Sequence, residues 1–138
     1  FAVVGQKPYL FYGTVKDNID LYNEKDDEDI EKLANQLGIE LNIEHHRKGY
    51  SYIVQDNGTN LSGGEKQKIA LLRSFSKNAS LIILDEPSSA LDSQSKKQLV
   101  YYINATKKSK IYIIVSHDQE ILSCCDYLID CQGGSIAE

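Results

Sequence analysis

Short apolar runs alternate with helical patterns in the second half of the chain. Residues 81–84 (L-I-I-L) and 111–115 (I-Y-I-I-V) are too short for helices, and Pro87 follows the first run closely. Such runs are typical of strands buried on both faces. A strand, a helix and a second strand in this order imply a right-handed crossover and a parallel sheet. Two further short strands are predicted, at residues 1–4 and 127–130.

A period of 3.6 residues predicts the helices. Residues 30–37 carry apolar side chains at i, i+3, i+4 and i+7, with Asp26 or Asp27 as an N-cap and Gly38 as a stop. The less patterned stretch 39–60 is expected to hold one short helix and a loop. Three further helices are predicted to begin at Ser62, at Asp92 or Ser93, and near Ile121.

Composition narrows the class of protein. The chain has 138 residues and a net charge of -5, which argues against binding nucleic acid through phosphate neutralisation. The acidic run 24–31 is interpreted as the solvated start of a helix. No apolar run approaches the roughly 20 residues of a membrane-spanning helix, and no secretory signal is present, so we expect a soluble, cytosolic chain. Phe1 opens an apolar run without an initiating Met, which suggests a cut through a larger protein.

Cysteine and histidine pairs elsewhere do not indicate a metal site. Cys124, Cys125 and Cys131 show no metal-ligand spacing and are expected to be reduced and packed, as intracellular cysteines usually are. His45 and His46 are adjacent, so on a helix their side chains would point apart, and we interpret them as polar surface.

The segment 61–67 (L-S-G-G-E-K-Q) is the first candidate for chemistry. Ser62 and Glu65 fit the S-x-x-E capping box, so a purely structural interpretation exists. A capping box does not require the two glycines Gly63 and Gly64, which allow a ligand to approach the backbone closely. A helix start with free N–H groups and a hydroxyl suits phosphate oxygens.

Two carboxylates, Asp85 and Glu86, follow the apolar run 81–84. They could simply end a strand, but the carboxyl ends of parallel strands are where open α/β sheets bind ligands. Phosphoryl transfer requires a metal to neutralise charge and a group that orients or deprotonates water. Asp85 suits the metal and Glu86 the base. His117, which follows the next strand, suits a hydrogen bond to the transferred phosphoryl group.

Together these motifs resemble those of ATP-binding-cassette (ABC) ATPases over nearly the whole chain. Residues 61–67 resemble the family signature, 81–86 the Walker B strand with its catalytic glutamate, and 89–92 (S-A-L-D) the D-loop. His117 matches the switch histidine, and Gln6 matches the Q-loop glutamine that reaches the metal and the attacking water. The resemblance implies catalytic roles for Glu86, His117 and Gln6, Mg²⁺ binding through Asp85 and Gln6, and contacts to ATP from Ser62, Gly63, Gly64, Glu65 and Asp92.

The implied fold is α/β: part of a RecA-like P-loop NTPase sheet with a helical subdomain that carries the signature. The expected division is a strand and Q-loop over 1–6, a helical subdomain over 7–80 and an α/β part over 81–138. Residues 8–15 (P-Y-L-F-Y-G-T-V) resemble the segment that follows the Q-loop in exporters, and Asp56 stands where exporters have an acidic coupling residue. Expected partners are a second nucleotide-binding domain and transmembrane domains, at the cytoplasmic face of a membrane that we expect to be bacterial.

Three departures from the family pattern bear on activity. The sequence contains no G-x-x-x-x-G-K-[ST] loop, which cradles the β- and γ-phosphates in the family. Glu65 replaces the commoner Gln of the signature, and Gly5 stands where Pro usually precedes the Q-loop glutamine. In the family the signature binds ATP held by the opposite protomer, so this chain carries half of each composite site. By itself it is therefore expected to be inactive, with uncovered strand edges where the missing strand would lie.

Two alternatives stay open from the sequence. Chromosome-maintenance ATPases also have an S-G-G-E-K signature and an Asp-Glu strand end, but a long coiled coil precedes their signature. No sustained heptads lie between Gln6 and Leu61, which favours the exporter. The second alternative is a chain that folds and associates without catalysis. The transported substrate is not determined by these residues, so peptide, lipid and drug export are all compatible with them.

Overall fold

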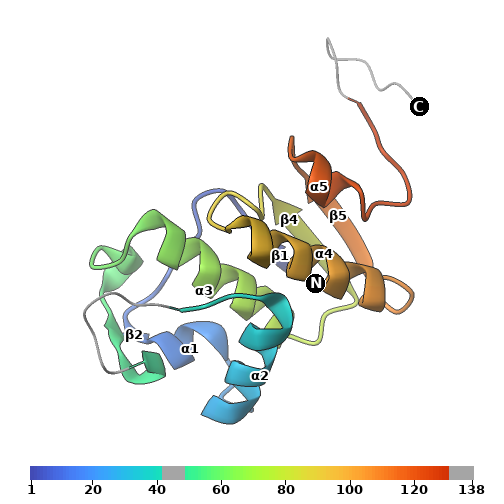
Figure 1. The fold of residues 1–138 in the computed structure, drawn as a ribbon. Helices are drawn as coiled ribbons and strands as arrows, with labels where there is room; N and C mark the ends of the chain where they lie inside the picture. The colour runs from blue at the N-terminus through green and yellow to red at the C-terminus, as the bar shows by residue number, and fades with distance from the viewer. Residues whose placement is uncertain (42–48, 131–138) are drawn as a thin grey trace.

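A computed structural model describes residues 1–41 and 49–130 of the chain. Its centre is a parallel sheet in the order β1-β4-β5, formed by Ala2–Val4, Leu81–Asp85 and Ile111–Val115. Ala2 pairs with Ile82, and Leu81 pairs with Ile111. The predicted α/β class with a parallel sheet is therefore confirmed (Figure 1).

Helices surround one face of this sheet (Figure 1). The long helices are α2 (Asp27–Leu37), α3 (Gly63–Ser76) and α4 (Ser93–Thr106), with short helices α1 (Val15–Ile19) and α5 (Gln119–Leu122). A small antiparallel pair, β2 (Gly13–Thr14) with β3 (Ile53–Val54), and two 3-10 turns, η1 (Gly49–Ser51) and η2 (Asp56–Gly58), complete the described elements.

The predicted helix boundaries agree with the caps that the structure shows. Asp26 accepts a hydrogen bond from the N–H of Asp29 and caps α2, which ends at Gly38 with φ of 66°. Ser62 caps α3 and Asp92 caps α4. Each cap satisfies a backbone N–H group that the first helical turn leaves without an intrahelical partner.

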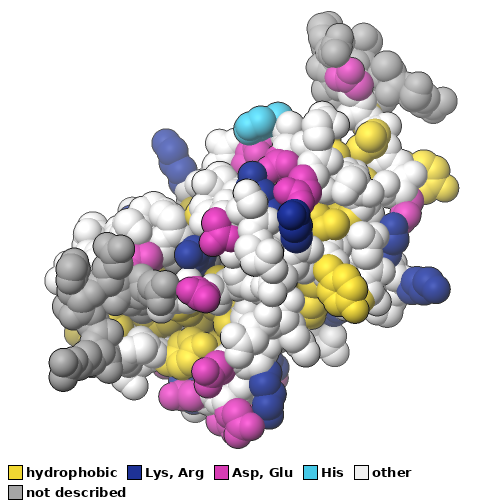
Figure 2. All heavy atoms as spheres, viewed as in Figure 1, with side chains coloured by type: hydrophobic (Ala, Val, Ile, Leu, Met, Phe, Trp, Pro, Cys, Tyr) yellow, Lys and Arg dark blue, Asp and Glu magenta, His cyan; other side chains and the backbone are white. Residues whose placement is uncertain are grey.

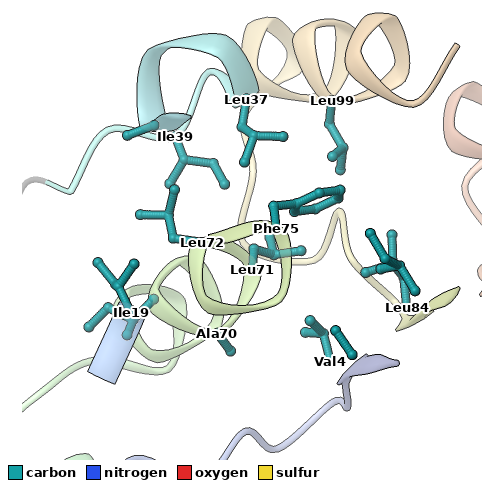
Figure 3. Close-up of a cluster of buried hydrophobic side chains, with 14 of the residues drawn as sticks. Val4, Ile19, Leu37, Ile39, Ala70, Leu71, Leu72, Phe75, Leu84 and Leu99 are labelled. Atoms are coloured by element: carbon teal, nitrogen blue, oxygen red, sulfur yellow. The ribbon is translucent and has the colours of Figure 1, made fainter. Parts of the chain in front are cut away.

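Helix α3 runs through the core and buries side chains on several sides. Leu71, Leu72 and Phe75 point from it toward residues of α2, α4 and the sheet (Figure 3). One cluster of buried residues extends from Val4 and Leu84 of the sheet to Leu37 of α2. The predicted boundary between subdomains at residue 80 stays a prediction. The cluster of buried residues includes side chains from both sides of that boundary.

The sheet has one covered and one open face. Ile82 and Leu84 of β4 are fully buried, whereas Ile111, Ile113 and Val115 of β5 are 65%, 49% and 57% exposed. Within the described residues β5 pairs only with β4, so its outer edge has no neighbouring strand there.

The strand predicted at residues 127–130 was wrong. Residues 127–130 form no strand apart from an isolated bridge at Asp130, and Tyr127 is 91% exposed. An apolar run becomes a strand only where another strand offers hydrogen bonds, and none of the described strands pairs with it. The described part of the stretch 39–60 holds two 3-10 turns and a short strand. The short helix predicted in this stretch stays a prediction, because residues 42–48 lie outside the described residues. Glu44, His45, His46 and Cys131 lie outside the described residues.

None of the helices in the two described ranges has the length and apolar character that crossing a membrane requires. Cys124 is buried and Cys125 partly buried, and both are free thiols, in agreement with the packing predicted for them.

Candidate nucleotide-binding and hydrolysis site

Glu86 and His117 meet where two parallel strands end. β4 ends at Asp85 and β5 at Val115, and these two residues pair in register, so the residues that follow lie at one edge of the sheet. The backbone N–H of Glu86 donates to the carbonyl of Val115 at 2.8 Å, which extends the ladder by one step. The sequence placed both side chains at strand ends, and the parallel register brings them together.

Donors from the β5 end hold the carboxylate of Glu86. His117 Nδ1 lies 2.8 Å from Glu86 Oε1, the His117 N–H donates to the same oxygen at 3.2 Å, and the Ser116 hydroxyl donates to Oε2 at 3.3 Å. A carboxylate accepts hydrogen bonds, so Nδ1 is the donor in this contact. Glu86 adopts φ of 49°, in the left-handed region that few non-glycine residues occupy. The strained backbone directs the carboxylate toward β5.

The exposure of the two side chains differs sharply. The His117 side chain is 91% exposed, and that of Glu86 is 18% exposed. Figure 2 shows the histidine on the surface with acidic side chains next to it. A held carboxylate beside an exposed imidazole suits a reaction on a ligand that arrives from solvent.

Asp85 and Gln6 supply the oxygen atoms expected for a magnesium site. Val4 pairs with Leu84, so Asp85 at the end of β4 and Gln6 just after β1 belong to the same edge of the sheet, and Gln6 is exposed. Carboxylate and amide oxygens are the ligands that Mg²⁺ prefers, so the donor set fits this ion. The described residues contain no cluster of three or more His, Cys, Asp or Glu side chains. An ion here therefore depends on phosphate oxygens, water or other residues for most of its ligands.

The start of α3 combines a complete capping box with open glycines. The Ser62 N–H and hydroxyl donate to Glu65 Oε2 at 2.7 and 2.6 Å, and Ser62 Oγ accepts from the Glu65 N–H at 3.3 Å. A Cβ added to Gly63 would meet nothing within 4 Å, and one added to Gly64 would make an ordinary 3.8 Å contact with Ala90. Neither glycine has a φ that other residues avoid. The fold of the described chain therefore does not require glycine at either position.

Asp92 acts as a helix cap in this structure. Its carboxylate accepts from the Ser95 N–H at 2.8 Å, and hydrogen bonds from Ser95 hold the pKa of Asp92 below its usual value. A contact of Asp92 with nucleotide stays a prediction. A Cβ added to Gly64 would lie 3.8 Å from the Cβ of Ala90, so the segment 89–92 passes close to the signature.

The segment that follows Gln6 is held by Arg73 of α3, a role that the sequence patterns did not reveal. The guanidinium donates to the carbonyl of Tyr9 at 2.9 Å and to Asn18 Oδ1 at 2.9 Å, and lies over the ring of Phe11 at 5.8 Å. Burial lowers the pKa of Arg73. Tyr9 in turn donates to Asp56 Oδ1 at 2.9 Å, which joins this segment to the turn before the signature.

The sequence also gave no signal for the residues that support His117. Asp118 accepts from Lys96 of α4 at 2.6 Å, and its N–H donates to Ser116 Oγ at 3.1 Å. Only the approach of α4 to the β5–α5 turn brings these groups together, and no spacing along the chain predicts it.

Comparisons with known proteins agree with this geometry. A family model described as "ABC transporter" matches residues 1–89. The chain is 36% identical to multidrug resistance protein homolog 65 of Drosophila melanogaster, covering 99% of this chain and 11% of the relative. It is 32% identical to the ATP-dependent lipid A-core flippase of Vibrio cholerae, covering 100% of this chain and 24% of that protein.

A solved structure of a bacterial Atm1-family ABC exporter with ATP bound superposes with a TM-score of 0.83 at 27% identity, over 99% of this chain and 24% of that one. The chain thus spans between a tenth and a quarter of the length of these relatives. The family model covers more than half of the chain, and several relatives exceed 30% identity. The chain belongs to the ABC transporter family, and the solved structure that it resembles is that of an ABC exporter.

Proposed function

We propose that this chain forms part of the nucleotide-binding domain of an ABC exporter, and that the intact protein hydrolyses ATP to drive export. The observation that carries the proposal is the contact of Glu86 with His117 at 2.8 Å, at the ends of adjacent parallel strands. A carboxylate and an imidazole in this arrangement can activate a water and stabilise a transferring phosphoryl group.

In the proposed reaction Glu86 orients or deprotonates the attacking water. In this proposal His117 carries a proton on both ring nitrogens. Nδ1–H stays with Glu86, and Nε2–H donates to the γ-phosphate, whose charge grows on its equatorial oxygens in the transition state. Asp85 and Gln6 hold Mg²⁺, which neutralises phosphate charge when bound. Gln6 would also contact the attacking water, and it would couple the occupancy of the site to the transmembrane domains.

The second half of the site serves a nucleotide on the opposite protomer. Ser62, Gly63, Gly64 and Glu65 lie at the start of α3, where the helix dipole and free N–H groups favour an anion. Gly63 leaves open space there, which a phosphate can occupy. Asp92, next to this surface, completes the proposed set of ATP contacts. Head-to-tail association with a second nucleotide-binding domain therefore brings each signature to the partner's ATP.

The transmembrane domains are the second proposed partner, at the cytoplasmic face of the membrane. A groove of about 450 Å³ runs between β1 and the C-terminal part of α3. Its lining includes Leu21 and Tyr22, which are 50% and 65% exposed, and Val3 at 56%. Exposed apolar side chains gathered in one groove favour a protein partner that covers them.

The chromosome-maintenance alternative is not favoured, because the relatives include multidrug resistance proteins and a lipid A-core flippase. The exporter proposal is tested with Glu86→Gln in the intact protein. We expect ATP hydrolysis to fall at least about 100-fold while ATP still binds, because the amide cannot accept the water's proton. Glu28→Gln, on the exposed face of α2, is the matched control and should leave the rate unchanged. Loss of ATP binding in Glu86→Gln would show that Glu86 is structural.

A further inference from the structure

The loop that carries His117 is tied to helix α4 by an ion pair. Lys96 Nζ donates to Asp118 Oδ2 at 2.6 Å, and the two side chains are only 28% and 18% exposed. Exposed ion pairs contribute little because water and salt screen them and both side chains are mobile. This pair is largely shielded, which makes it a defined connection between two elements that are 22 residues apart.

Asp118 links this ion pair to Glu86 and His117 through further hydrogen bonds. Its Oδ1 accepts from the Glu120 N–H at 3.0 Å and caps α5. Its own N–H donates to Ser116 Oγ at 3.1 Å, and the same hydroxyl donates to Glu86 Oε2 at 3.3 Å. The residues on both sides of His117 are therefore held through their side chains: Ser116 bonds to Glu86, and Asp118 bonds to Lys96.

The imidazole has little else to orient it. Its side chain is 91% exposed, so packing against neighbours restricts it weakly, and its contact with Glu86 is a single hydrogen bond. The direction of an exposed ring depends on the backbone that carries it. A shift of the Asp118 backbone would therefore displace His117 from the phosphoryl group.

Lys96 also connects His117 with the segment 89–92. It lies one turn into α4, and its N–H donates to the carbonyl of Asp92 at 2.9 Å. Asp92 ends that segment, which passes close to the signature at Ala90, 3.8 Å from where a Cβ on Gly64 would lie. The segment 89–92, the first turn of α4 and the His117 loop are thus joined by hydrogen bonds, next to the start of the signature helix.

We propose that Lys96 is a positioning residue for ATP hydrolysis. It holds Asp118, and through Asp118 the backbone of His117, where the imidazole reaches the γ-phosphate. It acts through Asp118 and not on the reacting atoms. This inference rests on the proposed function and adds to it a residue that no motif contains.

The test is steady-state ATPase of the intact protein with Lys96→Met and Lys96→Arg. Lys96→Met keeps the length of the side chain and removes its charge, and we expect kcat to fall about tenfold with KM for ATP within about twofold, because misplacement of a group that acts in the transition state lowers kcat. Lys96→Arg restores the ion pair and should recover at least about half of the wild-type kcat.

Lys107→Met is the matched control, because Lys107 lies at the other end of α4 and pairs with Asp126 at 2.6 Å, with 29% of its side chain exposed. It should leave kcat unchanged. A wild-type kcat in Lys96→Met overturns the inference, and so do equal losses in Lys96→Met and Lys107→Met that follow a loss of thermal stability. Glu86→Gln is assayed in parallel. If it still hydrolyses ATP, the proposed function fails, whereas a normal Lys96→Met rate beside an inactive Glu86→Gln overturns the positioning role alone.

Discussion

Glu86 and His117 make a 2.8 Å contact across 31 residues of sequence. Each residue stands directly after a strand, and the two strands are adjacent and parallel, so the contact follows from the register of the sheet. The Glu86 carboxylate is largely shielded and belongs to a residue with a strained backbone, whereas the His117 imidazole is exposed.

Replacing His117 with Ala should lower kcat for ATP about 100-fold in the intact protein, with ATP binding retained. The imidazole would no longer donate to the γ-phosphate, while Glu86 would keep the hydrogen bonds from the His117 N–H and the Ser116 hydroxyl. Steady-state kinetics and equilibrium binding of a fluorescent ATP analogue measure the two effects. Ser116→Ala removes the 3.3 Å bond to Glu86 and the 3.1 Å bond from the Asp118 N–H, but leaves the imidazole in place, and should cost no more than about threefold. Equal losses in both variants would contradict a direct role for the imidazole.

Gly63→Ala should separate activity from stability. The added Cβ meets open space in this chain, and Ala is the better helix former, so the free energy of unfolding should stay unchanged or rise by up to about 1 kcal/mol. ATPase of the intact protein should nevertheless fall, because the methyl group would occupy the space that we propose for a phosphate of the nucleotide on the opposite protomer. Urea denaturation of the 138-residue chain and ATPase assays test the two halves of the prediction. Normal turnover in this variant would show that no ligand approaches Gly63.

Gly38→Ala should behave in the opposite way. Gly38 ends α2 at φ of 66°, and a Cβ there would lie 2.9 Å from Gln98 Cβ of α4. The left-handed backbone and the contact together should destabilise the chain by roughly 1–3 kcal/mol. The midpoint of urea denaturation is the readout. Gly5→Ala serves as the control, because nothing lies within 4 Å of a Cβ at that position. A Gly38→Ala midpoint equal to that of Gly5→Ala would refute the packing of α2 against α4.

Cys124 should be unreactive in the folded chain. Burial raises the pKa of its thiol to about 11, so almost none of it is thiolate at neutral pH. In a Cys131→Ser background, iodoacetamide at pH 8 should modify the partly buried Cys125 first, and Cys124 only after unfolding, as mass spectrometry of the peptides would reveal. Rapid labelling of Cys124 in the native chain would disprove the packing seen for α5.

The same thiol makes stability depend on pH in the alkaline range. The folded state holds the Cys124 proton more tightly than the unfolded state does, so its contribution is complete below the unfolded pKa of about 9 and is lost as pH rises toward about 11. Cys124→Ala should flatten the fall in the free energy of unfolding between these two values. An unchanged slope would indicate that other groups, such as the half-buried tyrosines Tyr102 and Tyr112, determine it.

The isolated 138-residue chain should have negligible ATPase activity. It contains the residues proposed to act on water and on the γ-phosphate, but its sequence contains no G-x-x-x-x-G-K-[ST] loop to hold the β- and γ-phosphates. A malachite-green phosphate assay on the wild-type chain and on Glu86→Gln decides this. Turnover that Glu86→Gln abolishes would prove that a complete site exists within these residues.

Local signals in the sequence were sufficient for much of the fold. Ser62 and Asp92 mark helix starts and Gly38 a helix end, because caps depend on residues a few positions apart. The run 127–130 misled for the opposite reason: an apolar run is a strand only if a partner lies beside it, and no local pattern reveals that partner.

By itself the sequence predicted the candidate site residues and determined their local setting: Ser62–Gly64 at a helix start, and Asp85, Glu86 and His117 at strand ends. Residue types and their order are enough for such motifs, since each is read over a few neighbouring positions. Only the tertiary structure decided that Glu86 and His117 are in contact and that Lys96 supports them through Asp118. Sheet register and helix packing set those distances, and both depend on contacts between residues far apart in the chain.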